Sequence, residues 1–96
     1  MTKPGSNPLP YEIIYLDIVV NEHIPDLPKQ MRDLIKRAIE TRLTIDPVGL
    51  GKPLRYSLVG HRRLRIGDYR LVYRIDVEQH SVLIVLIKYR KAVYES

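Results

Sequence analysis

The sequence predicts a single α+β domain in which one strand and two helices precede a three-stranded antiparallel meander. Three observations predict it: a helical stripe of apolar residues over 28–43, a period of two from position 57 onwards, and a Gly67-Asp68 hairpin signal. A chain of 96 residues can bury one hydrophobic core. Residues 1–10 hold proline, glycine and polar residues without apolar periodicity, so we expect a flexible leader and one domain over 11–96.

The N-terminal half should form the first strand and both helices. Residues 11–16 are aromatic and β-branched, and apolar residues on both faces make a central strand possible. A short helix is expected over 18–24. Prolines then lead into a second helix over 28–43, which the Asp46-Pro47 pair and Gly49 end, so that residues 46–53 should form a loop.

The C-terminal half should form strands over 58–66, 69–76 and 81–89. With Gly67 and Asp68 as the hairpin loop, Arg65 lies opposite Arg70, and the two faces of the hairpin separate by chemistry. The apolar face, on which we expect the helices to pack, collects Leu64, Ile66, Tyr69, Leu71, Tyr73 and Ile75. The other face collects His61, Arg63, Arg65, Arg70 and Arg74.

This cationic face contains much of the chain's excess charge. The formal net charge is +5, and the half from position 52 onwards holds ten Lys and Arg against four Asp and Glu. Like charges directly opposite one another destabilise a sheet, whereas several arginine forks on a rigid surface suit phosphate oxygens. A polyanionic partner is therefore expected, with RNA, DNA, an acidic protein segment and a membrane surface as candidates; a merely solvated basic surface is the alternative.

The C-terminal segment adds cations and an aromatic ring to this group. Lys88, Arg90 and Lys91 follow the last strand, and Tyr94 can stack on a base, bind phosphate or simply pack. The chain has no cysteine, its three histidines lack metal-ligand spacing, and no glycine-rich phosphate loop follows a strand, so neither a metal nor a small-molecule cofactor is expected. Without a signal peptide or a membrane-spanning apolar run, we expect a cytoplasmic protein that does not bind membranes.

An ordered set of short motifs resembles the RelE/ParE toxin superfamily, on the RelE side, from about position 11 to 94. The set comprises Gly51-Lys52-Pro53-Leu54-Arg55, the Leu64–Ile75 stretch with its Arg-Ile-Gly-Asp-Tyr-Arg core, then Tyr89-Arg90 and Val93-Tyr94. The resemblance implies a twisted antiparallel β-sheet with the two helices packed on one face. It also implies a toxin of a type II toxin–antitoxin pair that cleaves mRNA on the ribosome without a metal.

Catalytic roles follow from the resemblance residue by residue. Arg70 matches the arginine that stabilises the charged transition state, Arg90 the general acid, and Tyr94 the tyrosine that orients the substrate. Where founding members carry two lysines, this chain has His61 and Arg63; an arginine is not a base at neutral pH, so His61 is the candidate general base. The remaining cations expected to bind RNA are Lys52, Arg55, Arg65, Arg74, Lys88 and Lys91.

The leading hypothesis is thus a ribosome-dependent endoribonuclease, an mRNA interferase that inhibits translation, with a cognate antitoxin protein as its partner. One alternative is a ParE-like toxin without nuclease activity that acts on DNA gyrase. Another is a non-catalytic nucleic-acid-binding module, whose association would be tight and salt-sensitive without cleavage.

Overall fold

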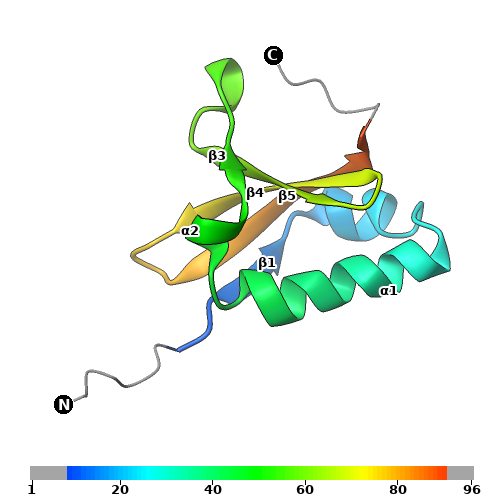
Figure 1. The fold of residues 1–96 in the computed structure, drawn as a ribbon, viewed down its shortest axis with the longest axis horizontal. Helices are drawn as coiled ribbons and strands as arrows, with labels where there is room; N and C mark the ends of the chain where they lie inside the picture. The colour runs from blue at the N-terminus through cyan, green and yellow to red at the C-terminus, as the bar shows by residue number, and fades with distance from the viewer. Residues whose placement is uncertain (1–8, 91–96) are drawn as a thin grey trace.

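The computed structural model describes residues 9–90, which form a five-stranded sheet with helices on one face (Figure 1). The predicted leader therefore lies outside the described residues, except for Leu9 and Pro10. Between residues 9 and 90, no helix is both long enough and apolar enough to cross a bilayer. The predicted α+β class is confirmed.

The sheet is mixed, because its first strand runs parallel to the last. The strands lie side by side in the order β1-β5-β4-β3-β2, and only the β1–β5 pair is parallel. Their bounds are β1 Glu12–Tyr15, β2 Lys52–Pro53, β3 His61–Ile66, β4 Tyr69–Asp76 and β5 Ser81–Tyr89. The expectation of a wholly antiparallel sheet is wrong on this point, since the helices and the meander return the chain to β1 in its own direction.

β1 is an edge strand and not the central strand that its two apolar faces suggested. Ile14 lies on the face away from the helices and is 44% exposed. The residues that follow it remain exposed as well, with Leu16 38% and Ile18 46% exposed. Apolar residues on both faces of a short strand therefore do not require burial on both faces.

The two predicted helices are present, each with a π-helical turn. The first is a short turn, η1 Val19–His23, and the second runs through α1 Lys29–Ala38 into η2 Ile39–Leu43. Figure 1 shows α1 lying across one face of the sheet. Its buried residues recur at the predicted helical spacing, so the stripe packs on the sheet and the charged side chains remain in solvent.

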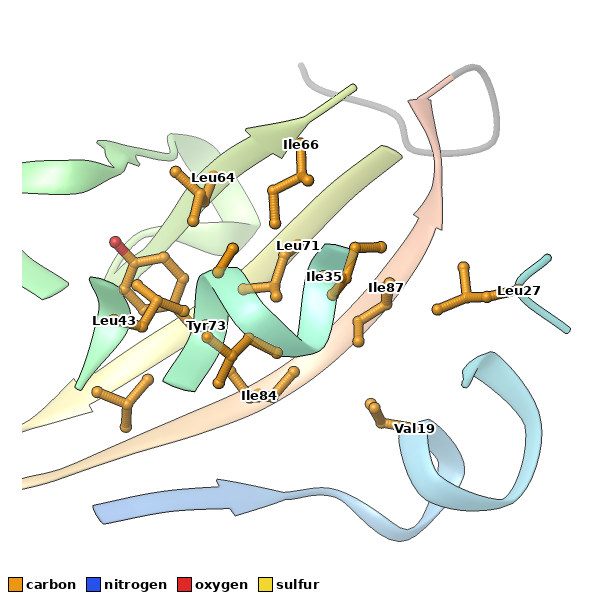
Figure 2. Close-up of a cluster of buried hydrophobic side chains, with 13 residues drawn as sticks. Val19, Leu27, Ile35, Leu43, Leu64, Ile66, Leu71, Tyr73, Ile84 and Ile87 are labelled. Carbon is orange, nitrogen blue, oxygen red and sulfur yellow. The ribbon is translucent and has the colours of Figure 1, made fainter. Parts of the chain in front are cut away.

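The core lies between this helical layer and the apolar face of the meander (Figure 2). Ile39 and Leu43 from the helix meet Leu71, Tyr73 and Ile84 from the sheet, and all five are at most 1% exposed. The predicted apolar face is confirmed, with Leu64, Ile66, Leu71 and Tyr73 buried and Tyr69 and Ile75 packed at the margin. The opposite face is consequently free of helices and carries the polar chemistry.

The segment predicted as a loop over 46–53 contains a short helix, α2 Pro47–Leu50, followed by β2. The Asp46 carboxylate caps α2 by accepting the Gly49 amide at 3.0 Å. The Arg62 guanidinium then donates to the Val48 and Gly51 carbonyls, each at 2.6 Å. This segment is thereby held against β3 as an extra edge strand.

The hairpin has the predicted register, with Arg65 opposite Arg70 and His61 opposite Arg74. Gly67 adopts a positive φ of 59°, a conformation that suits glycine in a tight turn. β3 begins at His61 and not at Leu58, because a 3₁₀ turn and Gly60, with φ of 94°, interrupt the extended backbone. The other two strands of the meander have the predicted bounds.

Candidate nucleic-acid interface

The sheet face without helices, here called the open face, carries side chains in four rows that cross the strands. The rows follow from the strand register, because paired residues point to the same side of a sheet. Nearest the hairpin lie Arg65, Arg70 and Lys88; next come Lys52, Arg63, Val72 and Leu86; the third row holds His61, Arg74, Leu83 and Ile14, and the last holds Asp76, Ser81 and Glu12. The first two rows concentrate positive charge at the hairpin end.

Four arginines gather at that end, and we call Arg63, Arg65, Arg70 and Arg90 the arginine cluster. Arg70 is at its centre: partial burial, and then the charges of the three other arginines, lower the pKa of its guanidinium. The three neighbouring guanidiniums, the second cause of this lowered pKa, create a positive potential around Arg70 that favours an anion in this place.

A hollow of about 270 Å³ opens at the cluster. Its lining consists of Leu50, Lys52, Arg63, Leu64, Arg65 and Arg70. The cations come from β2, β3 and β4, so hydrogen-bonded strands hold their backbones in fixed relative positions. Such an arrangement can surround one phosphodiester with guanidinium forks without reorganising the backbone.

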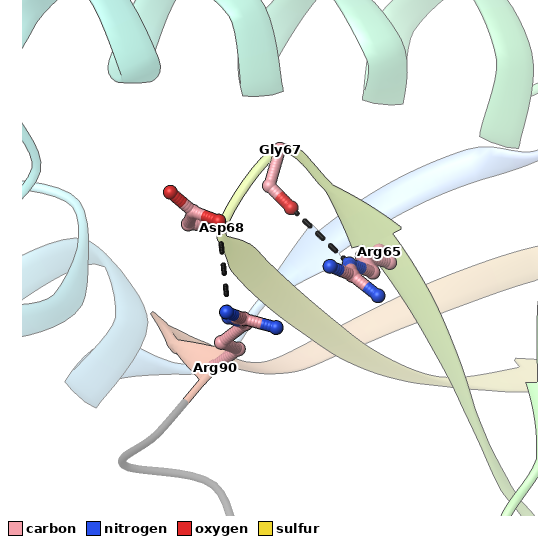
Figure 3. Close-up of polar contacts among 4 residues, drawn as sticks. All are labelled: Arg65, Gly67, Asp68 and Arg90. Atoms are coloured by element: carbon pink, nitrogen blue, oxygen red, sulfur yellow. Dashed lines mark hydrogen bonds and ion pairs between the residues drawn. The ribbon is translucent and has the colours of Figure 1, made fainter.

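The hairpin loop positions two members of the cluster (Figure 3). Arg65 Nε donates to the Gly67 carbonyl at 3.3 Å. The Arg90 backbone amide donates to the Asp68 carbonyl at 2.8 Å, and Arg90 Nε lies 3.8 Å from Asp68 Oδ1. With side chains 38% and 63% exposed, this ion pair orients Arg90 more than it stabilises the fold.

The structure separates the predicted site residues into groups. Lys52, Arg63, Arg65 and Arg70 line the hollow, while Lys88 on β5 and Arg90 just after β5 adjoin it. His61 and Arg74 share the open face but lie in the third row, roughly 13 Å along the strands from Arg65 and Arg70. Arg55 is exposed ahead of the 3₁₀ turn, and Lys91 and Tyr94 lie outside the described residues.

Two residues act on this interface that the sequence did not single out for these roles. Arg62 alternates with the cationic residues and therefore points to the opposite side of β3, where it holds β2. Asp68 contacts Arg90 from the hairpin loop. The alternation of side chains along β3 could have indicated the direction of Arg62 from the sequence. The contact of Asp68 with Arg90 joins two distant segments and could not. Residues 9–90 hold no group of three or more His, Asp or Glu side chains suited to a metal ion.

Comparison with known proteins gives a family match over nearly the whole domain. Residues 11–94 match the family described as "ParE toxin of type II toxin-antitoxin system, parDE". Among curated proteins of Mycobacterium tuberculosis, Toxin RelE is 41% identical over 71% of this chain and 70% of its own length. Toxin RelG is 44% identical over 54% of this chain, and the matched stretch spans only 60% of that relative.

Solved structures agree with the sequence matches. The toxin–antitoxin complex RelBE2 from M. tuberculosis contains a chain with a TM-score of 0.79 and 32% identity, covering 85% of this chain and 100% of that one. The archaeal RelE–RelB complex from Pyrococcus horikoshii gives a TM-score of 0.68 at 22% identity, covering 88% and 100%. At 22% identity, the similarity to the P. horikoshii chain supports only the fold.

Proposed function

Because this chain belongs to the RelE/ParE superfamily of type II toxin–antitoxin toxins, we propose that it is a ribosome-dependent endoribonuclease that cleaves mRNA without a metal. The observation that carries the proposal is the arginine cluster, in which Arg63 and Arg65 of β3 and Arg90 just after β5 lie close enough to lower the pKa of Arg70 on β4. A rigid group of permanent cations suits a reaction whose transition state is a doubly charged phosphorane.

The reaction assigns a task to each part of the cluster. The 2′-hydroxyl attacks the adjacent phosphorus, a 2′,3′-cyclic phosphate forms, and the 5′-oxygen leaves with a proton. Arg70, with Arg63 and Arg65 beside it, neutralises the equatorial phosphorane oxygens. Arg90, oriented by Asp68, protonates or hydrogen-bonds the leaving oxygen, the role of general acid that the family assigns to the matching arginine.

Removal of the 2′ proton requires a side chain that can be unprotonated near neutral pH, and an arginine stays protonated there. His61 is the imidazole on the open face, two residues before Arg63 on β3, and we assign it as the general base. Because His61 lies roughly 13 Å along the strands from Arg70, this role requires the reacting phosphodiester to lie beside Arg63, between the two residues. Its ring nitrogen Nδ1 is buried and makes no hydrogen bond among the described residues. Tyr94, outside the described residues, keeps the substrate-orienting role of its family counterpart.

The same cations offer a binding surface for a cognate antitoxin in the cytoplasm. The M. tuberculosis chain that is 32% identical was solved within the toxin–antitoxin complex RelBE2. An acidic, amphipathic antitoxin segment over the cluster would replace RNA and block the active site. Crosslinks confined to the exposed side of α1 would contradict this mode of inhibition.

The matched family description, which names a ParE toxin, supports a second candidate, a toxin that acts on DNA gyrase. Primer extension on mRNA after induced expression separates the two. Cuts confined to translated messages support the nuclease. DNA damage without mRNA cuts would contradict the nuclease proposal and support the gyrase-directed function.

A further inference from the structure

A second pocket, of about 460 Å³, opens near the third row of the open face. We call it the Arg74 pocket, and its lining is Ile14, Arg74, Ile75, Asp76, Ser81 and Leu83. Register places Arg74 beside Leu83, and Leu83 beside Ile14, so the three side chains form one row from β4 across β5 to β1. The catalytic roles assigned above do not use this pocket.

The pocket combines an apolar floor with groups of both charges. Ile14 is 44% exposed, and Leu83 is partly exposed beside it, which leaves apolar surface open to a planar ligand. Arg74 is exposed at one end of this surface, and a guanidinium stacks well on a heteroaromatic ring. The Asp76 carboxylate, which accepts the Gln79 amide at 3.1 Å, adds an acceptor of the kind that reads exocyclic amino groups.

The distance from the arginine cluster fits a nucleotide a few positions away along the RNA. Arg74 lies four positions after Arg70 on β4, or roughly 13 Å along the strand. A stacked strand advances about 3.4 Å along its helix axis per nucleotide, so this distance corresponds to a few nucleotides and to fewer in an extended strand. Val72 and Leu86 lie in the row between, so an RNA strand crossing them would meet no opposing charge there.

The geometry points to the Arg74 pocket as a nucleobase subsite for the mRNA, holding a base a few nucleotides from the scissile phosphate. The base lies on Ile14 and Leu83, stacks against Arg74 and donates an exocyclic amino hydrogen to Asp76. The subsite thereby favours cytosine, adenine or guanine over uracil. This inference rests on the proposed function because it takes RNA as the ligand, but it does not require that the RNA be cleaved.

The test uses RNA that cannot be cleaved, so that binding is measured apart from catalysis. Hexacytidylate and hexauridylate with 2′-O-methyl groups are titrated into the ¹⁵N-labelled full chain while amide chemical shifts are followed. Hexacytidylate should shift amides of the arginine cluster and of Ile14 and Leu83, and should bind more tightly than hexauridylate. Arg74→Ala should weaken hexacytidylate binding roughly fivefold or more, the effect of losing one stacked base, and abolish the shifts at the pocket.

Two variants provide the controls. Arg37→Ala makes the same charge change on the exposed side of α1 and should leave the pocket shifts in place. Asp76→Asn keeps the acceptor for the Gln79 amide while removing the carboxylate, and should narrow the difference between the two oligonucleotides.

Three results would overturn the subsite. The first is an absence of shifts at the pocket with hexacytidylate, and the second is equal loss of affinity in the Arg74 and Arg37 variants. The third is an Arg74→Ala variant that binds the antitoxin more weakly but shows the same amide shifts with RNA as the wild type. That result would make the pocket part of a protein interface. If RNA shifts the amides of the Arg74 pocket but the protein does not cleave mRNA, the nuclease proposal is wrong and the subsite stands.

Discussion

Replacing Arg70 by glutamine should make the protein less active without making it less stable. Arg70 lies directly opposite Arg65 on β3 and beside Lys88 on β5. Each like-charge pair across strands costs about 0.2–1 kcal/mol, so two pairs give roughly 0.4–2 kcal/mol. Because the side chains are partly exposed, solvent screening moves the cost of the two pairs toward the lower end of this range. We expect relief of this repulsion in Arg70→Gln to contribute about 0.5 kcal/mol to the free energy of unfolding.

The assay is urea unfolding at low salt and at 1 M NaCl, combined with cleavage on programmed ribosomes. The gain in stability should shrink at high salt, since charge repulsion is screened there. Cleavage should slow by roughly 10² to 10³, the usual effect of removing a donor to a developing oxyanion. Arg37→Gln is the matched control for charge and should leave cleavage unchanged. Destabilisation of Arg70→Gln at both salt concentrations would show that Arg70 is structural, and wild-type cleavage would remove it from the site.

Three further substitutions test the scaffold by urea unfolding. Tyr73→Phe leaves the buried Pro47 carbonyl without the hydroxyl that donates to it at 2.6 Å and should cost about 1–2 kcal/mol; a smaller loss would mean that water replaces the bond. Gly67→Ala forces a side chain into a φ of 59° and should cost about 1 kcal/mol. Burial lowers the pKa of His23, whose Nδ1 accepts a hydrogen bond from the Ile87 backbone amide. Neutral His23 therefore stabilises the folded protein. This contribution is complete above the unfolded pKa of about 6.5 and is lost as pH falls through the folded pKa. His23→Asn should therefore lose less stability than the wild type between pH 7 and pH 5, and an equal loss would exclude His23 as the source.

The meander was predictable because its signals are local. Alternation of apolar and charged residues assigns the two faces, and the Gly67-Asp68 loop fixes which residues pair. These two signals suffice to place Arg65 opposite Arg70, and hence to predict the cationic face from sequence. The apolar stripe of α1 is equally local, which is why the helical layer was predicted on the correct face.

The segment between the helices and the meander was not predictable in the same way. Its short helix α2 and strand β2 depend on Arg62, which lies 14 residues after Val48 and 11 after Gly51 and satisfies both carbonyls. Nothing in the local Pro and Gly content distinguishes this segment from a loop. The parallel pairing of β1 with β5 is likewise set by contacts between the two ends of the domain.

The separation of the two pockets also needed the tertiary structure, and it changes how the cationic face is understood. From sequence, His61 and Arg74 belong with the other arginines, because all of them share one side of the hairpin. In the sheet, β5 and β1 extend their row with Leu83 and Ile14, whereas Lys88 extends the row of Arg70. One end of the face therefore suits phosphate and the other suits a base. If His61 is the general base, His61→Ala should lower kcat by roughly 10² to 10⁴. If His61 only contacts RNA beside Arg74, the loss should appear in KM with kcat unchanged.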